Sequence, residues 1–553
     1  MKRRSFFYFL TASVVVLLLT GIGGCQLLGR APLSLLGGGN QTMPAAAMFV
    51  PKQAPVMVSL LVNPDRLEKR RQSLKQLKTS LFANTGLDYQ RDLQPWLGDE
   101  ITLAITSTDI DRQAENGRQP GYLMALATAD PDKSREFLQT LFSKRAIAGT
   151  ALGTEQYKGV KLIYDNSQPQ LDKSEGRLSG AVIGDRFVLF ANHPKVLRDA
   201  INNVQVPDLG WSSSSQYQQA LTLLPTQRIA VAFLNLPTLA EWLGNQPEAQ
   251  IYQSQIIALE LTPQGLAAET ALLATSTSKR DSPPASDLSQ PVKALKYIPG
   301  RASLAISGSE LNRLGNTNLS QWTQVSSGLL SSGVNQPLAA LQADWGIDLP
   351  RDIFSWVQGE YALGLLPNLA QTAPDWVFVA EKSDAATSGI SHLDAIAQEQ
   401  GFSISSLTLG EQKISAWTQL TTTPTSSPEL DRTSITLKAK VQGVHATVGS
   451  YEILTTSIEA MDAALKASQN QSLLDNAKFQ AGIEPIPRPN KGYLYLDWTA
   501  SQGTLERQLP ILKLLKVVGD PFFSRLRSLT LSSYGSETGL LKGGVFFNLG
   551  SKE

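Results

Sequence analysis

The sequence predicts an α+β fold of two homologous repeats, each a mostly antiparallel or mixed sheet with helices packed on it, after an N-terminal signal or anchor segment. One block, residues 86–100, recurs at residues 346–360 with Gly, Asp, Arg, Trp and Glu at matching positions. A shorter match relates residues 49–54 to residues 297–302, and an apolar run follows each. Because both matches lie at similar offsets, we interpret them as parts of one duplicated unit.

The first 25 residues are typical of an export signal. Residues 2–4 are basic, and an uncharged, largely apolar run covers residues 5–24. The run ends at Cys25, the single Cys of the chain, in an Ile-Gly-Gly-Cys sequence that resembles a bacterial lipobox. Cys25 is therefore predicted to be lipidated. The alternative is an uncleaved anchor helix, because about 19 apolar residues approach the length that spans a bilayer.

Two changes in composition divide the remaining chain. Residues 26–47 lack periodicity and predict a flexible tether. Residues 275–294 are rich in Pro, Ser and charge, which is typical of a linker between domains. The repeats then cover residues 48–274 and 295–549, and each is long enough to bury its own core.

Hydrophobic patterning predicts the elements of repeat one in order. Strands are expected at residues 56–62, 101–105, 122–127, 160–164, 181–183, 187–191, 229–234 and 256–261. Helices are expected at residues 64–83, 131–143, 194–202 and 215–223. Gly184-Asp185 and residues 263–265 predict tight hairpin turns.

Repeat two presents a matching series of strands. Its counterparts lie at residues 304–306, 376–380, 447–450, 492–496 and 529–543. Because tight turns join several strands, we expect antiparallel or mixed sheets with helices packed on one side.

The repeated block has a structural interpretation. In each copy the Asp follows a Gly and is well placed to cap a short helix. The Arg can then pair with that Asp or with the Glu of its block, and the Trp anchors the short helix against the sheet. The alternative is a Trp–Arg–Glu ligand pocket, one in each repeat. The residues concerned are Asp88, Arg91, Trp96 and Glu100, then Asp348, Arg351, Trp356 and Glu360.

The sequence predicts no catalytic, cofactor or metal site. None of the three His residues lies within metal-ligand spacing of another, and no nucleophile elbow, Walker loop or dinucleotide fingerprint is found. With Cys25 at the anchor, the body has no thiol for a disulfide, a metal or a nucleophile. A net charge of +1 does not favour nucleic acid. A hydrolase with dispersed carboxylates leaves no local motif and stays an alternative.

Two segments are suited to a membrane or a partner. Residues 66–78 place six cations on one predicted helix, which could lie on anionic headgroups or form a solvated outer face. Residues 509–523 are unusually apolar for a stretch with two prolines, so they predict either a docking or lipid-contact surface or a packed core segment.

With these features the chain resembles an uncharacterised cyanobacterial family of membrane-tethered, exported proteins, a domain of unknown function. The resemblance depends on the signal-bearing N-terminus, the Phe49-Val50-Pro51 opening and the Gly-x-Asp, Arg-Asp, Trp and Glu pattern of the repeated block. It covers most of residues 48–549. It implies a plasma- or thylakoid-membrane setting, with the body in the periplasm or thylakoid lumen, and supplies no catalytic residue.

We therefore predict a non-catalytic, membrane-tethered binding or scaffold protein that aids assembly or maintenance of membrane complexes. The expected partners are the membrane itself, proteins in or at it, and lipid, without a cofactor or nucleic acid. A carrier or sensor of an apolar ligand such as a lipid or pigment is the second hypothesis, and the dispersed-carboxylate hydrolase is the third.

Overall fold

The computed structural model describes residues 43–62, 89–111, 119–166, 178–225, 228–242, 252–262, 264–274, 287–312, 341–343, 345–367, 374–426, 433–502, 523–537 and 540–549. Several predictions lie outside these residues: the signal segment with Cys25, most of the tether, the helix at 64–83, Asp88, most of the linker and nearly all of the apolar run at 509–523.

The first half, residues 43–274, contributes ten strands. They are β1 (Val56–Leu60), β2 (Leu97–Ser107), β3 (Gly121–Thr128), β4 (Leu152–Tyr157), β5 (Val160–Asp165), β6 (Ser179–Ile183), β7 (Phe187–Ala191), β8 (Ala230–Asn235), β9 (Tyr252–Thr262) and β10 (Gly265–Ala274). Its helices are η3 (Ala45–Phe49), η4 (Tyr89–Leu93), α3 (Pro131–Ile147), α4 (Pro194–Gln205), η6 (Pro207–Leu209), η7 (Trp211–Ser213), α5 (Ser215–Thr222) and α6 (Leu236–Trp242).

The second half, residues 287–549, contributes the other ten. Its strands are β11 (Leu304–Ser309), β12 (Glu360–Leu366), β13 (Asp375–Glu381), β14 (Ser403–Leu409), β15 (Gln412–Ser426), β16 (Thr433–Val448), β17 (Tyr451–Thr455), β18 (Gly492–Asp497), β19 (Leu526–Glu537) and β20 (Leu540–Leu549). Its helices are η8 (Lys293–Tyr297), η9 (Leu349–Ile353), η10 (Phe354–Trp356), α10 (Asp384–Glu399), α11 (Ile458–Ala467), η11 (Leu473–Asp475) and α12 (Ala477–Ile483).

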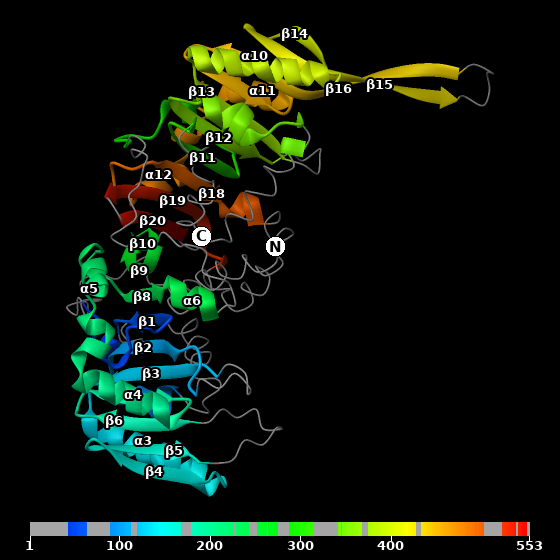
Figure 1. Cartoon of the computed structure of the whole chain (residues 1–553). Helices are drawn as coiled ribbons and strands as arrows, with labels where there is room; N and C mark the ends of the chain where they lie inside the picture. Colours follow the sequence, from blue (N-terminus) through cyan, green and yellow to red (C-terminus); the bar gives the residue numbers. More distant parts are fainter. Residues whose placement is uncertain are drawn as a thin grey trace.

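The twenty strands of the described residues join one antiparallel sheet, which extends from β4 at the bottom of Figure 1 to β14 at the top. From the central β10–β20 pair the first half continues as β9, β8, β1, β2, β3, β7, β6, β5 and β4. The second half continues as β19, β18, β11, β12, β13, β17, β16, β15 and β14. The predicted α+β class with a largely antiparallel sheet is confirmed. The joining of the halves through β10 and β20 was not predicted.

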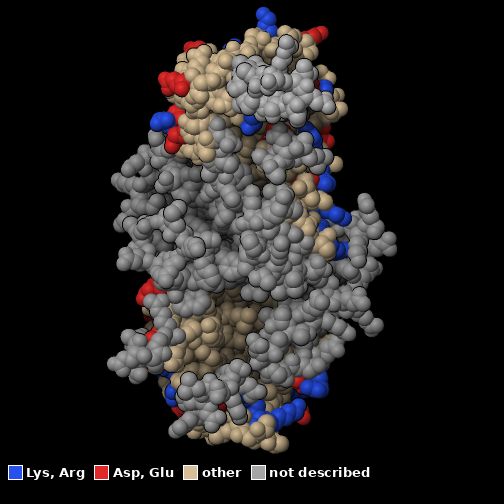
Figure 2. All heavy atoms as spheres, turned by 90° about the vertical axis from the view of Figure 1, so that its right-hand side faces the viewer, with Lys and Arg blue, Asp and Glu red and all other residues tan. Residues whose placement is uncertain are grey.

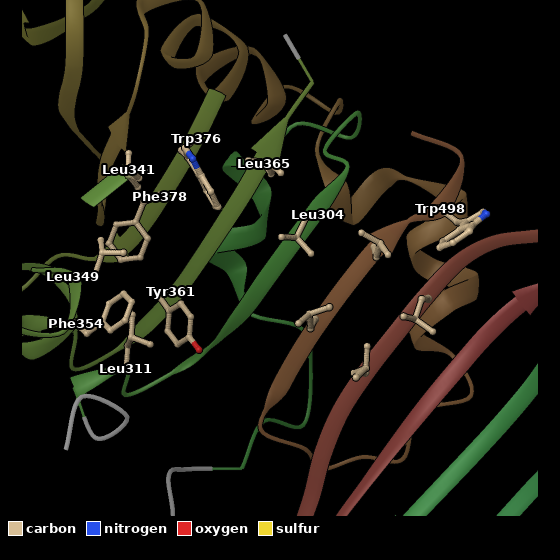
Figure 3. Close-up of a cluster of buried hydrophobic side chains, with 14 of the residues drawn as sticks. Leu304, Leu311, Leu341, Leu349, Phe354, Tyr361, Leu365, Trp376, Phe378 and Trp498 are labelled. Carbon is tan, nitrogen blue, oxygen red and sulfur yellow. The ribbon is translucent and has the colours of Figure 1, made fainter. Parts of the chain in front are cut away.

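Helices cover both faces of the sheet, so the expectation of helices on one side is wrong. Strand β7 shows this directly, because alternate residues of a strand point to opposite faces. Val188 and Phe190 pack in one cluster with Leu138 of α3. Phe187 and Leu189 pack in another cluster with α4. In the second half α10 packs in the cluster shown in part in Figure 3, while α11 and α12 pack on the opposite side.

The folded body begins earlier than predicted. Ala46 and Ala47, placed in the predicted tether, are buried in η3. Val292 and Ala294, placed at the end of the predicted linker, are also buried at the start of η8. Small apolar residues of this kind have no periodic pattern that would mark them as core.

Among the described residues, no helix has the length and apolar character needed to cross a bilayer.

Strands β15 and β16 extend past their neighbours as a two-stranded arm, which projects at the top right of Figure 1. Strand β14 pairs with β15 only as far as Thr418, and β17 pairs with β16 only from Val444 onward. Within the described residues, 419–426 and 433–440 therefore pair only with each other. At the corresponding places in the first half, the described parts of β5 and β6 have 6 and 5 residues, against 15 and 16 here.

Candidate functional site

The Asp of the second repeated block caps a one-turn helix, as the sequence predicts. The Asp348 carboxylate accepts the Arg351 backbone N–H at 3.0 Å, and Asp352 accepts the Asp348 N–H at 2.8 Å. The Arg351 guanidinium donates to both carboxylate oxygens of Asp352, at 2.7 and 3.0 Å. This guanidinium lowers the pKa of Asp352 to about 2, although burial acts in the opposite direction.

The Arg of each block pairs with the Asp that directly follows it in the sequence. Asp88, a partner that the sequence analysis considered for Arg91, lies outside the described residues. Arg91 donates to Asp92 at 2.9 and 3.1 Å, as Arg351 does to Asp352. Neither Glu100 nor Glu360 takes part in this pair, because each is turned toward a different element described below.

The Trp of each block fixes the same one-turn helix to a longer helix. The indole N–H of Trp96 donates to the Asp92 carbonyl at 2.8 Å, and that of Trp356 donates to the Asp352 carbonyl at 2.7 Å. The ring of Trp96 lies 5.2 Å from that of Phe137 on α3. The ring of Trp356 lies against Gly389 on α10, where a Cβ would come within 2.6 Å of the indole Cγ.

The Glu of each block holds the 3-10 helix that opens its half. The buried Glu100 carboxylate accepts the N–H groups of Ala45 and Ala46, at 3.0 and 2.9 Å, at the start of η3. Glu360 accepts the N–H of Lys293, at 2.8 Å, at the start of η8. Burial raises the pKa of Glu100 despite these hydrogen bonds. In each half, the Glu of the repeated block therefore connects this block to the helix at the start of the opening segment.

The three side chains of each block contact three different elements. The Arg stays beside its own turn, the Trp meets α3 or α10, and the Glu meets η3 or η8. The contacts that we observe are therefore those of packing and capping, and they do not bring the three side chains together at one site.

A second group of polar residues lies at the root of the arm. One carboxylate oxygen of Asp394 on α10 accepts the indole N–H of Trp417 at 2.7 Å and lies 3.0 Å from Nε2 of His445. Trp345 packs edge-on against Trp417 at 5.3 Å. A Cβ at Gly443 would overlap the Trp417 ring, so this glycine is needed for the close approach. These contacts fix the place where β15 shifts its register between Trp417 and Thr418.

The other two His residues also have structural contacts. His193 accepts the Lys195 N–H at 3.1 Å and caps α4. Nε2 of His392 lies 3.5 Å from the Asp352 carboxylate. In the part of the chain that the structure describes, no three His, Cys, Asp or Glu side chains gather where they could hold a metal ion.

The third group, which we call the junction cluster, consists of Glu260, Glu269, Tyr534 and Lys542. Burial raises the pKa of both carboxyl groups, and Glu260 raises that of Glu269 further. The ring of Tyr534 crosses β20 over Gly544, where a Cβ would lie 3.3 Å from its hydroxyl. Gly544 is the register partner of Glu269, so Tyr534 of the second half reaches Glu269 of the first. Sequence reasoning missed this cluster because its members come from strands far apart in the chain.

The described residues on one face of the molecule carry charges of both signs (Figure 2). On the face shown in Figure 2, basic and acidic side chains of the described residues are mixed. This agrees with the near-zero net charge of the whole chain.

Comparison with known proteins identifies the family but no activity. No curated protein matches the chain. Among solved structures, crystal forms I and III of TP0453 each align with a TM-score of 0.26, at 9% and 8% identity, over 43% of this chain and 81% and 82% of theirs. The family model described as "Protein of unknown function (DUF3352)" matches residues 10–549. The chain therefore belongs to the DUF3352 family.

Proposed function

We propose that this chain is a non-catalytic scaffold, tethered to a membrane by its N-terminus, with its body in the periplasm or thylakoid lumen. In this role it holds protein partners during assembly or maintenance of membrane complexes. The tether is the export-type segment that ends at Cys25, either lipidated or kept as an anchor helix.

The single observation that carries the binding role is the arm of β15 and β16. Within the described residues no further strand pairs with the arm, and an isolated hairpin of this kind is only marginally stable in water, so binding to a partner would stabilise it. The three aromatic residues and the Asp394 carboxylate at its root fix its direction. A projecting hairpin whose base is held in place by such contacts is suited to binding another protein.

The two halves are, in this proposal, copies of one ancestral unit. Three observations support it: the identical strand order outward from β10 and β20, the paired Trp contacts, and the paired Glu caps of η3 and η8.

A pull-down from solubilised membranes tests the scaffold proposal. The full chain is compared with a variant in which residues 421–438 are replaced by Asn-Gly, which closes Leu420 and Ala439 with a tight turn. The full chain is expected to retain stable protein partners and the short-arm variant to lose them. Retention of the same partners by both proteins would refute the role of the arm. Membrane fractionation of Cys25→Ala tests the tether separately, since loss from the membrane identifies a lipid anchor.

The apolar-ligand carrier is the second candidate. It is favoured by the apolar cluster that runs across one face of both halves, from Val56 and Leu259 to Trp376 and Trp498, part of which Figure 3 shows. Lipid or pigment that co-purifies with both the full chain and the short-arm variant would support the carrier over the scaffold.

A further inference from the structure

Strand β14 ends the sheet on the second half, and its outer edge lacks the usual protection against pairing. Within the described residues its one ladder partner is β15. Natural sheets guard such edges with charged residues, Pro or bulges. The sequence of β14, Ser-Ile-Ser-Ser-Leu-Thr-Leu, contains no charge and no Pro. Leu407 is 41% exposed there, and its neighbours Ser406 and Thr408 are exposed as well.

The other open edges of the described sheet do carry such guards. At the opposite end β4 contains Glu155, which pairs with Arg198 of α4 at 3.1 Å. Along the arm, β15 contains Pro424, which has no backbone N–H to donate, and β16 contains the exposed Lys440. The contrast between β14 and these three edges indicates that β14 is an edge kept open for pairing.

We propose that β14 pairs with β14 of a second copy of this chain, in antiparallel orientation across a two-fold axis. Such pairing is self-complementary and closes as a dimer. Pairing of β14 with β4 of another copy would instead grow an open polymer, and the Glu155–Arg198 pair at β4 opposes it. The proposed contact does not depend on the membrane tether.

The register of the pair follows from the faces of the strand. Directly opposite residues of an antiparallel pair share a face, so even-numbered residues must face even-numbered ones. Ile404 packs with one core cluster and Leu409 with another on the opposite face, so the two faces of β14 are distinct. The register that keeps the faces matched and pairs all seven residues places Ser406 on the axis. It sets Ser405 opposite Leu407 and Ile404 opposite Thr408, with no charge against charge.

The size of the contact sets its strength. Seven antiparallel residue pairs form about six to eight backbone hydrogen bonds. Such an edge contact is well below the roughly 800 Å² per partner of a standard interface. The dimer is therefore expected to be weak and dependent on concentration.

A charge exchange on the axis tests the pairing. Ser406→Glu and Ser406→Lys each place two like charges opposite one another, which should weaken association about fivefold or more. An equimolar mixture of the two variants places Glu opposite Lys and should restore it. Full-length copies labelled with donor or acceptor dyes and purified in detergent report association by energy transfer. Thr154→Glu, at an exposed position of the β4 edge, is the matched control and should associate like the unaltered chain.

Each outcome decides the proposal. Loss in both variants with recovery in the mixture supports it, and the recovery also shows that the variants are folded. Unaltered protein that remains monomeric at every concentration would overturn it. So would variants that associate normally, variants whose mixture does not recover, or a Thr154→Glu chain that associates as weakly as they do.

Discussion

Gly389→Ala tests the packing of the repeated block. A Cβ at this position of α10 would lie 2.5 Å from Nε1 and 2.6 Å from Cγ of Trp356. The indole cannot move away freely, because its N–H donates to the Asp352 carbonyl at 2.7 Å and its ring lies edge-on to Phe378 at 6.1 Å. Replacing Gly by Ala inside a helix normally stabilises it by about 1 kcal/mol. Overpacking of this kind costs about 3 kcal/mol. We therefore expect a net loss of about 2 kcal/mol.

A double-mutant cycle separates the two effects. In a Trp356→Leu background the clash is gone, so Gly389→Ala should stabilise the protein by about 1 kcal/mol and the coupling should be about 3 kcal/mol. The free energy of unfolding is measured by urea titration with circular dichroism at 222 nm, a standard helix signal. Ser388→Ala, one residue away and exposed, should change stability by no more than about 0.5 kcal/mol. Stabilisation by Gly389→Ala in the unaltered chain would refute the packing argument.

Three further predictions concern carboxylates that are buried or partly buried, and urea titrations at several pH values check the first two. Asp352→Asn should cost about 2 kcal/mol at neutral pH, because the pKa is about 2 in the folded state against 3.8 otherwise. That contribution is present above pH 3.8 and disappears as the pH falls through about 2, so an unchanged acid limb would contradict it. Glu260→Gln should stabilise the protein at neutral pH, because burial raises the pKa of this carboxyl and disfavours its charged form. The gain should fade at acidic pH, where the unaltered carboxyl is protonated, and a gain independent of pH would disprove this origin. Glu100→Ala leaves the N–H groups of Ala45 and Ala46 without their acceptor and should cost about 2 to 4 kcal/mol. Hydrogen exchange at Ala46 should accelerate, and unchanged exchange would show that Glu100 does not hold η3.

Features set by neighbouring residues could be predicted from the sequence. The Gly184 turn has the positive φ, 55°, that its Gly-Asp pair indicates, and β6 and β7 flank it as expected. Asp348 caps its helix through a residue three positions later. Such features depend on local spacing, so periodicity and residue type are sufficient to find them.

Features set by distant residues could not be predicted. Glu100 reaches an N–H group 55 residues earlier, and Glu360 reaches one 67 residues earlier. The sequence does not indicate which unpaired N–H group a carboxylate will accept. Both matched segments could be found in the sequence, but their contact could not. The junction cluster needs the pairing of β10 with β20, which depends on two strand edges that become neighbours only in the folded molecule.

The two halves share the contacts of the repeated block but differ in their outermost strands. We therefore assign the shared contacts to folding and the differing strands to binding. The Trp and Glu contacts occur in both halves because each half needs them to hold its own turn and opening helix. The outer strands differ between the halves as far as they are described. The first half ends in β4, which carries the Glu155–Arg198 pair, and in short β5 and β6, whereas the second half ends in the uncharged β14 and in long β15 and β16. Under the proposed duplication, such a difference at one end of the sheet, where packing does not require it, is what selection for binding at that end would produce. Because β14 and the distal arm share no ladder pairs, removing the arm should abolish partner binding without weakening the proposed dimer.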